Sequence, residues 1–140
     1  MNTPVSVILR ARNDMPVIKR TLDALKKQTF AHRIFAFDNA STDGTREELS
    51  KTAHLLTDIP EGKYIPGKIL NLGMQLSESD LVIFLNSDCV PCHDECLEKL
   101  IAGFAQTPEV PAAVFGRQIP RSDCNPLFFE DTEDTFGDGS

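Results

Sequence analysis

Short apolar runs alternate with amphipathic segments along this chain, and that alternation is the feature that most limits how it can fold. Residues 5–9 read Val-Ser-Val-Ile-Leu, which is typical of a strand buried on both faces of a parallel sheet. Asn13-Asp14 then offers a helix cap, and Ile18, Leu22 and Leu25 recur at helical spacing and predict an amphipathic helix that ends near Gln28. Strands joined through helices form parallel sheets with right-handed crossovers and helices on both faces, so we expect a three-layer α/β/α fold with a mostly parallel sheet.

The same rhythm continues to about residue 117. A single apolar α/β domain over residues 1–120 is therefore expected, followed by an acidic and weakly structured segment over 121–140. The predicted strands after the first cover residues 34–37, 54–58, 81–85 and 110–115. The predicted helices cover 45–53, 66–77 and a stretch that begins after Asp94 and includes Phe104 on its apolar stripe.

Composition and charge narrow the class of partner. The chain has 140 residues, 41% hydrophobic and 25% charged, which is ordinary for one soluble globular domain. Its net charge is -7, but residues 130–140 hold five of the 21 acidic groups, which leaves 14 basic against 16 acidic groups elsewhere. A protein that binds nucleic acid needs a dense basic face, so we do not expect this chain to bind nucleic acid. The sequence contains no apolar run of about 18 residues and no signal peptide at its start, so we expect no membrane span and a cytoplasmic location.

Four cysteines, at positions 89, 92, 96 and 124, raise the question of a metal site. The run Cys89-x-x-Cys92-His93-x-x-Cys96 contains typical ligands, but zinc ribbons usually pair two Cys-x-x-Cys motifs about 12 to 20 residues apart. The second such motif is missing here. We therefore expect the cysteines to act as small apolar groups and the three histidines to lie on the surface. A metal-binding or thiol-based domain built on this run is the alternative.

Polar clusters follow three of the predicted strands, at residues 10–13, 38–41 and 86–88. The carboxyl ends of parallel strands meet at one edge of a sheet, and ligands of such sheets bind there. Asp88, with the amide of Asn86 beside it, offers the hard oxygen ligands that Mg²⁺ or Mn²⁺ prefers, and such ions complete their shell with phosphate oxygens.

A nucleoside diphosphate fits that edge. Asp38 or Asn39 can hydrogen-bond a base edge, and the phosphate charge can be met by three basic side chains, Arg10, Arg12 and Lys68. The alternative is that Asp38 and Asp88 only cap the helices that follow them.

Other α/β chemistries lack their motifs. Neither G-x-G-x-x-G nor G-x-x-x-x-G-K-[ST] follows the first predicted strand, which argues against dinucleotide binding and against a P-loop. Asp38 is followed two positions later by Ala40, so the Asp-x-Asp of haloacid-dehalogenase-like phosphatases is missing. The sequence also lacks the G-x-S-x-G turn that holds a hydrolase nucleophile.

In four segments the sequence resembles glycosyltransferase family 2. The resemblance covers roughly residues 4–120, and its most specific part is Asp38-x-x-Ser-Thr-Asp-Gly-Thr45. Arg10 and the segment Gly116-Arg-Gln-x-Pro-Arg121 make rhamnosyltransferase-like members the most similar. The four segments are residues 5–13, 37–45, the Gly67-x-x-x-Asn71-x-Gly73 stretch and 84–88.

The resemblance implies a GT-A fold, a nucleotide-diphosphate sugar donor such as a UDP- or dTDP-sugar, a divalent metal, and inverting transfer to an acceptor hydroxyl. By motif position the metal-binding acid would be Asp88, and the nucleobase pocket would be lined by Arg10, Arg12, Asp38 and Asn39. Two acids of the family pattern are amides here, Asn39 and Asn86, which ligate without adding charge.

The resemblance also implies a catalytic base beyond residue 140, because members of the family are usually longer. We therefore expect this chain to be the donor-binding part of a longer enzyme, and the catalytic residues stay unassigned. Phe128, Phe129 and Phe136 beside acidic groups suggest packing against further structure or pairing with a second copy of the chain. The alternative function is a non-catalytic nucleotide-binding, regulatory or assembly module.

Overall fold

The computed structural model describes residues 4–120 and 122. Strands and helices alternate through most of this range, as the sequence predicts. In chain order the elements are β1 (Val5–Ala11), α1 (Val17–Lys26), β2 (His32–Asp38), α2 (Thr45–Thr52), β3 (Leu55–Asp58), α3 (Pro66–Leu76), β4 (Val82–Asn86), α4 (Cys96–Ala102) and a 3₁₀ turn at Gly103–Ala105. The chain divides into two compact units, Met1–Glu98 and Lys99–Ser140.

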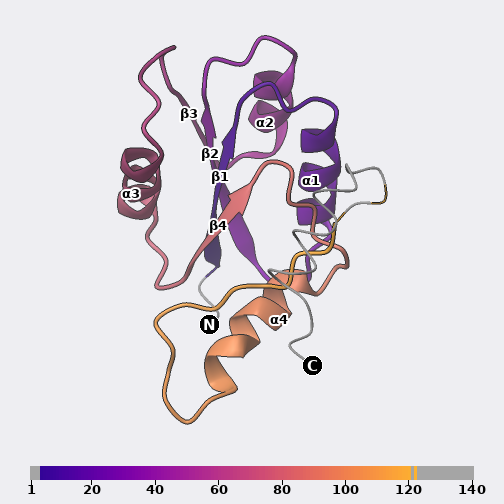
Figure 1. Ribbon diagram of the computed structural model, residues 1–140, viewed down its shortest axis with the longest axis vertical. Helices are drawn as coiled ribbons and strands as arrows, with labels where there is room; N and C mark the ends of the chain where they lie inside the picture. Colours follow the sequence, from indigo (N-terminus) through magenta and orange to yellow (C-terminus); the bar gives the residue numbers. More distant parts are fainter. Residues whose placement is uncertain (1–3, 121, 123–140) are drawn as a thin grey trace. The chain divides into compact units, whose positions relative to one another are not determined.

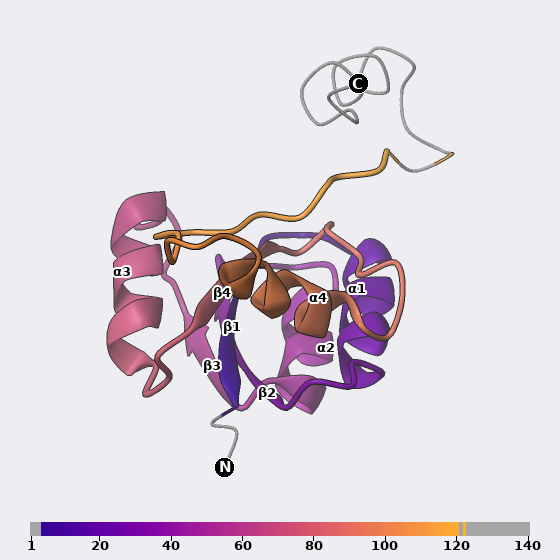
Figure 2. The same ribbon diagram turned by 90° about the horizontal axis from the view of Figure 1, so that it is seen from below.

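The four strands form one parallel sheet in the order β3-β2-β1-β4. The strand β1 lies between β2 and β4, and Val7, Ile8 and Leu9 are each fully buried. Burial of three successive residues requires cover on both faces of the sheet, since side chains alternate between the faces along a strand. The expected three-layer α/β fold is confirmed in the first unit, where α3 covers one face and α1 with α2 the other (Figures 1 and 2).

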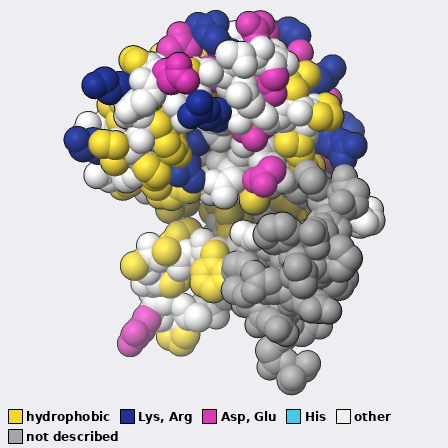
Figure 3. Space-filling view, turned by 45° about the horizontal axis from the view of Figure 1, so that its top comes forward, with side chains coloured by type: hydrophobic (Ala, Val, Ile, Leu, Met, Phe, Trp, Pro, Cys, Tyr) yellow, Lys and Arg dark blue, Asp and Glu magenta, His cyan; other side chains and the backbone are white. Residues whose placement is uncertain are grey.

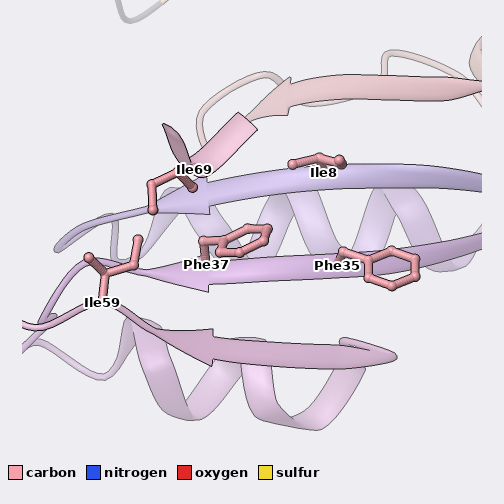
Figure 4. Close-up of a cluster of buried hydrophobic side chains, with 5 residues drawn as sticks. All are labelled: Ile8, Phe35, Phe37, Ile59 and Ile69. Atoms are coloured by element: carbon pink, nitrogen blue, oxygen red, sulfur yellow. The ribbon is translucent and has the colours of Figure 1, made fainter. Parts of the chain in front are cut away.

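A cluster of buried side chains joins the sheet to α3 (Figure 4). Tyr64, in the loop before α3, packs against this cluster. The opposite face is closed by apolar residues of α1 and by Leu49 of α2, at the spacing that the sequence shows. The cluster consists of Ile8, Phe35, Phe37, Ile59 and Ile69.

The predicted fifth strand at residues 110–115 is wrong. These residues have no strand pairing, and Val110 and Phe115 are 81% and 84% exposed. The run contains Pro111, which cannot donate to a sheet, and two alanines, which favour strands weakly, so its apolar character does not produce a strand without a partner.

Two smaller expectations concern the second unit. Phe104, expected in the last predicted helix, lies in the 3₁₀ turn that follows α4. The predicted acidic segment 121–140 lies outside the described residues apart from position 122, and the proposed boundary at residue 120 stays a prediction.

Among the described residues, none of the helices has the length and apolar character needed to cross a bilayer.

Candidate functional site

A hollow of about 370 Å³ opens at the carboxyl edge of the sheet, where β1, β2 and β4 end. We call it the rim hollow. Acidic and basic side chains lie mixed over this end of the molecule (Figure 3), so the face is polar and carries both signs of charge. The rim hollow is lined by Arg10, Ala11, Arg12, Asp14, Asn39, Tyr64, Asn86, Ser87 and Asp88.

Arg10 spans the rim hollow from the carboxyl end of β1. Its Nη2 donates to Asn86 Oδ1 at 2.7 Å, and its Nη1 donates to the Tyr64 hydroxyl at 3.1 Å. Arg10 and Asn86 are also register partners in the sheet, which places both side chains on one face. The guanidinium is therefore held in a fixed plane, and a planar group with several donors is suited to phosphate or carboxylate oxygens.

Asp14 ties the loop after β1 to the loop after β4. Its Oδ2 accepts from the Arg12 backbone N–H at 2.8 Å and from Ser87 Oγ at 2.6 Å, while its own N–H donates to Thr45 Oγ1 at 2.8 Å. The sequence suggests that Asn13-Asp14 caps α1, and that is wrong. The N-cap is Pro16, without a side-chain cap, and the Asp14 carboxylate instead faces the rim hollow.

Asp43 connects the same loop to the start of α2. Its Oδ2 accepts from the Met15 N–H at 2.9 Å and its Oδ1 from the Thr45 N–H at 3.0 Å. Hydrogen bonding from the Thr45 side chain, with these backbone donors, lowers the pKa of Asp43 against the opposing effect of burial. The ionised carboxylate thus fixes the loop that carries Arg12 and Asp14.

Asp38 and Asn39 each hold a buried oxygen that has no hydrogen-bond donor among the described residues. Asp38 is 1% exposed; its Oδ2 accepts from the Ser41 N–H at 3.0 Å, while its Oδ1 has no partner. The Oδ1 of Asn39 is likewise unpaired. The next residue, Ala40, has a φ of 52°, an uncommon value for a residue with a side chain. Unpaired buried acceptors beside a strained turn are typical of ligand sites.

The structure brings together five of the seven site residues predicted from the sequence. Asp38 lies buried beneath the rim hollow rather than in its lining, and Lys68 lies exposed on α3, outside it. Asp38 closes the turn at Ser41, and α2 is capped by Gly44, so Asp38 does not cap that helix. The five residues in the lining are Arg10, Arg12, Asn39, Asn86 and Asp88.

Sequence reasoning missed three further polar lining residues, Asp14, Tyr64 and Ser87. Ser87 stands within the polar cluster after β4, so its position was available from the sequence. Tyr64 enters from a loop far along the chain, and only its packing on the core cluster brings its hydroxyl to Arg10.

The oxygen atoms that line the rim hollow are suitable ligands for a hard divalent cation. Asp14 and Asp88 supply carboxylates and Asn86 an amide oxygen, which are the ligand types that Mg²⁺ and Mn²⁺ take in proteins. Asn86 Oδ1 already accepts from Arg10, so the two carboxylates are the stronger candidates.

Comparison with known proteins identifies relatives of this architecture. The sequence pattern of the family described as "Glycosyl transferase family 2" matches residues 6–131. The O-antigen chain rhamnosyltransferase RfbN of Salmonella typhimurium is 28% identical over 126 residues, which are 88% of this chain and 40% of that protein. The chain thus spans well under half the length of this relative.

Solved structures show the same fold. A structure of S. aureus TarS 1-349 in complex with UDP superposes with a TM-score of 0.57 at 27% identity, covering 73% of this chain and 32% of that one. The mannosyltransferase PcManGT of Pyrobaculum calidifontis, in complex with GDP-Man and Mn²⁺, superposes with a TM-score of 0.58 at 23% identity, covering 74% and 32%. The α/β fold with a parallel sheet expected from the resemblance is therefore confirmed.

Proposed function

Because this chain belongs to glycosyltransferase family 2, we propose that it binds a nucleotide-diphosphate sugar in the rim hollow and takes part in transferring the sugar to an acceptor hydroxyl with inversion. The observation that carries the proposal is the joint placement of two arginines and two carboxylates in one hollow at the carboxyl edge of a parallel sheet.

The diphosphate is assigned to the arginine side of the rim hollow. Arg10 is held by Asn86 and Tyr64, so binding an oxyanion costs it little further ordering. Arg12 is half exposed and its only ion pair among the described residues, with Glu61 at 3.7 Å, is long and solvent-exposed. That pair can be exchanged for phosphate at small cost. Lys68, from α3, lies outside the lining and is a further basic side chain proposed to meet the phosphate charge.

The nucleobase is assigned to the turn after β2. The unpaired Oδ1 of Asn39 is an acceptor for a base N–H, and pairing it would remove the cost of an unsatisfied buried oxygen. Asp38 supports this turn from below through Ser41. The neighbouring structure of TarS holds UDP, so UDP is the first probe and dTDP the second.

A divalent metal is assigned to Asp88, with Asp14 and Asn86 as further oxygen donors. Such an ion would neutralise charge on the diphosphate leaving group. The protein's own part is to hold the Asp14 carboxylate in place through Ser87 Oγ and the Arg12 N–H. We assign no catalytic base.

A second candidate is a nucleotide-binding module without transferase activity. The hydrogen bond from Arg10 to Asn86 favours this second candidate, because the guanidinium, at 2.7 Å, already occupies the Asn86 amide oxygen, one of the three proposed metal ligands. Binding of nucleotide that does not depend on metal separates this candidate from the first.

The test is calorimetric titration with UDP and with dTDP, each with and without Mn²⁺. Wild type is compared with Asp88→Ala and with Glu47→Ala, which removes one exposed carboxylate from α2. Metal-dependent binding that is lost in Asp88→Ala and kept in Glu47→Ala supports the donor site. Equal binding with and without Mn²⁺ favours the second candidate, and no binding by the folded protein overturns both.

A further inference from the structure

Cys92, His93 and Cys96 form a second group of potential metal ligands, two in the loop between β4 and α4 and the third at the first residue of α4. The Cys92 and Cys96 sulfur atoms lie 3.7 Å apart, and His93 Nδ1 lies 3.5 Å from Cys96 Sγ. All three ligand atoms fall within 4.8 Å of one another. Cys92 and His93 are exposed and Cys96 is half-buried, so the group can be reached from solvent.

These separations match those of ligands that share one tetrahedral Zn²⁺. With zinc–sulfur bonds of about 2.3 Å and tetrahedral angles, two bound sulfur atoms lie about 3.8 Å apart. With a zinc–nitrogen bond of about 2.0 Å, a bound sulfur and nitrogen lie about 3.5 Å apart. The two distances that involve Cys96 Sγ agree with these values within about 0.1 Å, and the Cys92 and His93 ligand atoms lie within 4.8 Å of each other, so small side-chain movements suffice to bind the ion.

The backbone is held by hydrogen bonds within the run of ligands and directly after it. Gln28, just beyond α1, donates through Nε2 to the His93 carbonyl at 2.9 Å and accepts through Oε1 from the Leu97 N–H at 3.0 Å. The Thr29 N–H donates to the Asp94 carbonyl at 2.8 Å. Leu97 is 3% exposed, which anchors the start of α4. Preorganisation of this kind lowers the ordering cost of metal binding.

A backbone donor also helps to orient one of the sulfur ligands. The His93 N–H points to Cys96 Sγ at 3.4 Å. The chemistry differs from that of the rim hollow, where the donors are oxygen atoms suited to Mg²⁺ or Mn²⁺. Sulfur and imidazole ligands select a softer ion.

We propose that Cys92, His93 and Cys96 bind one Zn²⁺ ion, with water in the fourth position, as a clip that fixes the loop between β4 and α4. Two thiols lose their protons on binding, and His93 binds as neutral imidazole through Nδ1. The loop also carries Asp88, four residues before Cys92, so the clip would limit movement at the edge of the rim hollow. From the sequence we expect the cysteines to act as small apolar groups, and the exposure of Cys92 contradicts that expectation.

Cys89 provides a matched control inside the same loop. It lies outside the group of three ligands and is half-buried. Cys89→Ser therefore removes a thiol of this loop without removing a proposed ligand.

The experiment measures metal bound by the reduced full chain. Metal-free protein is titrated with Zn²⁺ against a chromogenic chelator, and Co²⁺ is added in parallel because tetrahedral thiolate sites give it intense visible absorption. The variants are Cys92→Ser, Cys96→Ser and His93→Ala, with Cys89→Ser and Cys124→Ser as controls, and circular dichroism checks that each is folded.

The proposal predicts one Zn²⁺ per wild-type chain and a tetrahedral Co²⁺ spectrum. Both controls keep the stoichiometry, and either cysteine variant of the cluster lowers the affinity at least tenfold. Less than one equivalent in wild type, or equal loss in Cys89→Ser and Cys92→Ser, would overturn it. Binding of Zn²⁺ that resists both cluster variants would also overturn it. Because nucleotide is absent throughout, the result is independent of the donor site.

Discussion

Gly73 is the point at which α3 comes closest to the sheet, and replacing it with alanine tests that packing. A Cβ at this position would lie 2.5 Å from Ile8 Cδ1 and 2.8 Å from Ile8 Cγ2. Ile8 is fully buried in the centre of β1, so its side chain has little room to rotate away. Either Ile8 leaves its rotamer or α3 moves outward, and each costs packing energy.

The magnitude is set by two opposing effects. Overpacking of a close-packed core costs about 1–3 kcal/mol, and contacts this short belong at the upper end. Alanine in place of glycine inside a helix returns about 1 kcal/mol. We therefore expect Gly73→Ala to lower the free energy of unfolding by about 2 kcal/mol.

Gly67, in the first turn of the same helix, is the matched control. A Cβ there meets nothing within 4 Å, so Gly67→Ala should leave stability unchanged or raise it by up to about 1 kcal/mol. In urea unfolding the two variants should differ in midpoint by about 1 M at similar slope. Adding Ile8→Val to Gly73→Ala removes the shortest contact, so the pair should be less destabilising than the sum of the single changes. A Gly73→Ala protein as stable as Gly67→Ala would refute the reasoning.

Three further substitutions test the contacts of α2 and of the turn before it. Arg46 and Asp58 form a two-bonded ion pair with both distances at 2.7 Å but at an exposed position, so Arg46→Ala should lower the midpoint of urea unfolding only slightly, and less again at high salt. Because hydrogen bonding from Thr45 lowers the pKa of Asp43, its contribution is complete at neutral pH and is lost as the pH falls below about 4; Asp43→Asn should flatten that acid limb of stability against pH. Gly44 has a φ of 97°, and a Cβ there would meet only Met15 Cγ at 4.0 Å without a clash, so Gly44→Ala should lower stability by about 1–2 kcal/mol through backbone strain, which thermal unfolding would show.

Most of the sheet could be predicted because its strands are apolar in continuous runs. Residues 5–9 and 34–37 carry few polar side chains, and burial on both faces leaves only a parallel sheet between helices as a consistent arrangement. The run at residues 110–115 is equally apolar, yet it forms no strand. A strand also needs a partner to pair with, and composition does not report one.

The site was predictable where it follows strand ends and not where it depends on tertiary contacts. Asn39 and Asn86 lie in the rim hollow because each follows or ends a strand, which the sequence shows directly. Asp14 reads as a helix cap, and only the fold brings Ser87 within 2.6 Å of it. The group of Cys92, His93 and Cys96 fits no zinc-ribbon spacing, because its geometry comes from a loop held by Gln28.

The most direct test of the central claim is to locate a bound metal–nucleotide complex by nuclear magnetic resonance. At 15.5 kDa the chain suits amide spectra, and Mn²⁺ broadens signals close to it. With UDP present, small amounts of Mn²⁺ should broaden the amides of Ala11, Asn86 and Asp88 first and leave sharp those of Val5 and His32, which pair at the opposite ends of β1 and β2. Broadening that spares these residues, or that spreads evenly over the surface, would contradict a donor site in the rim hollow.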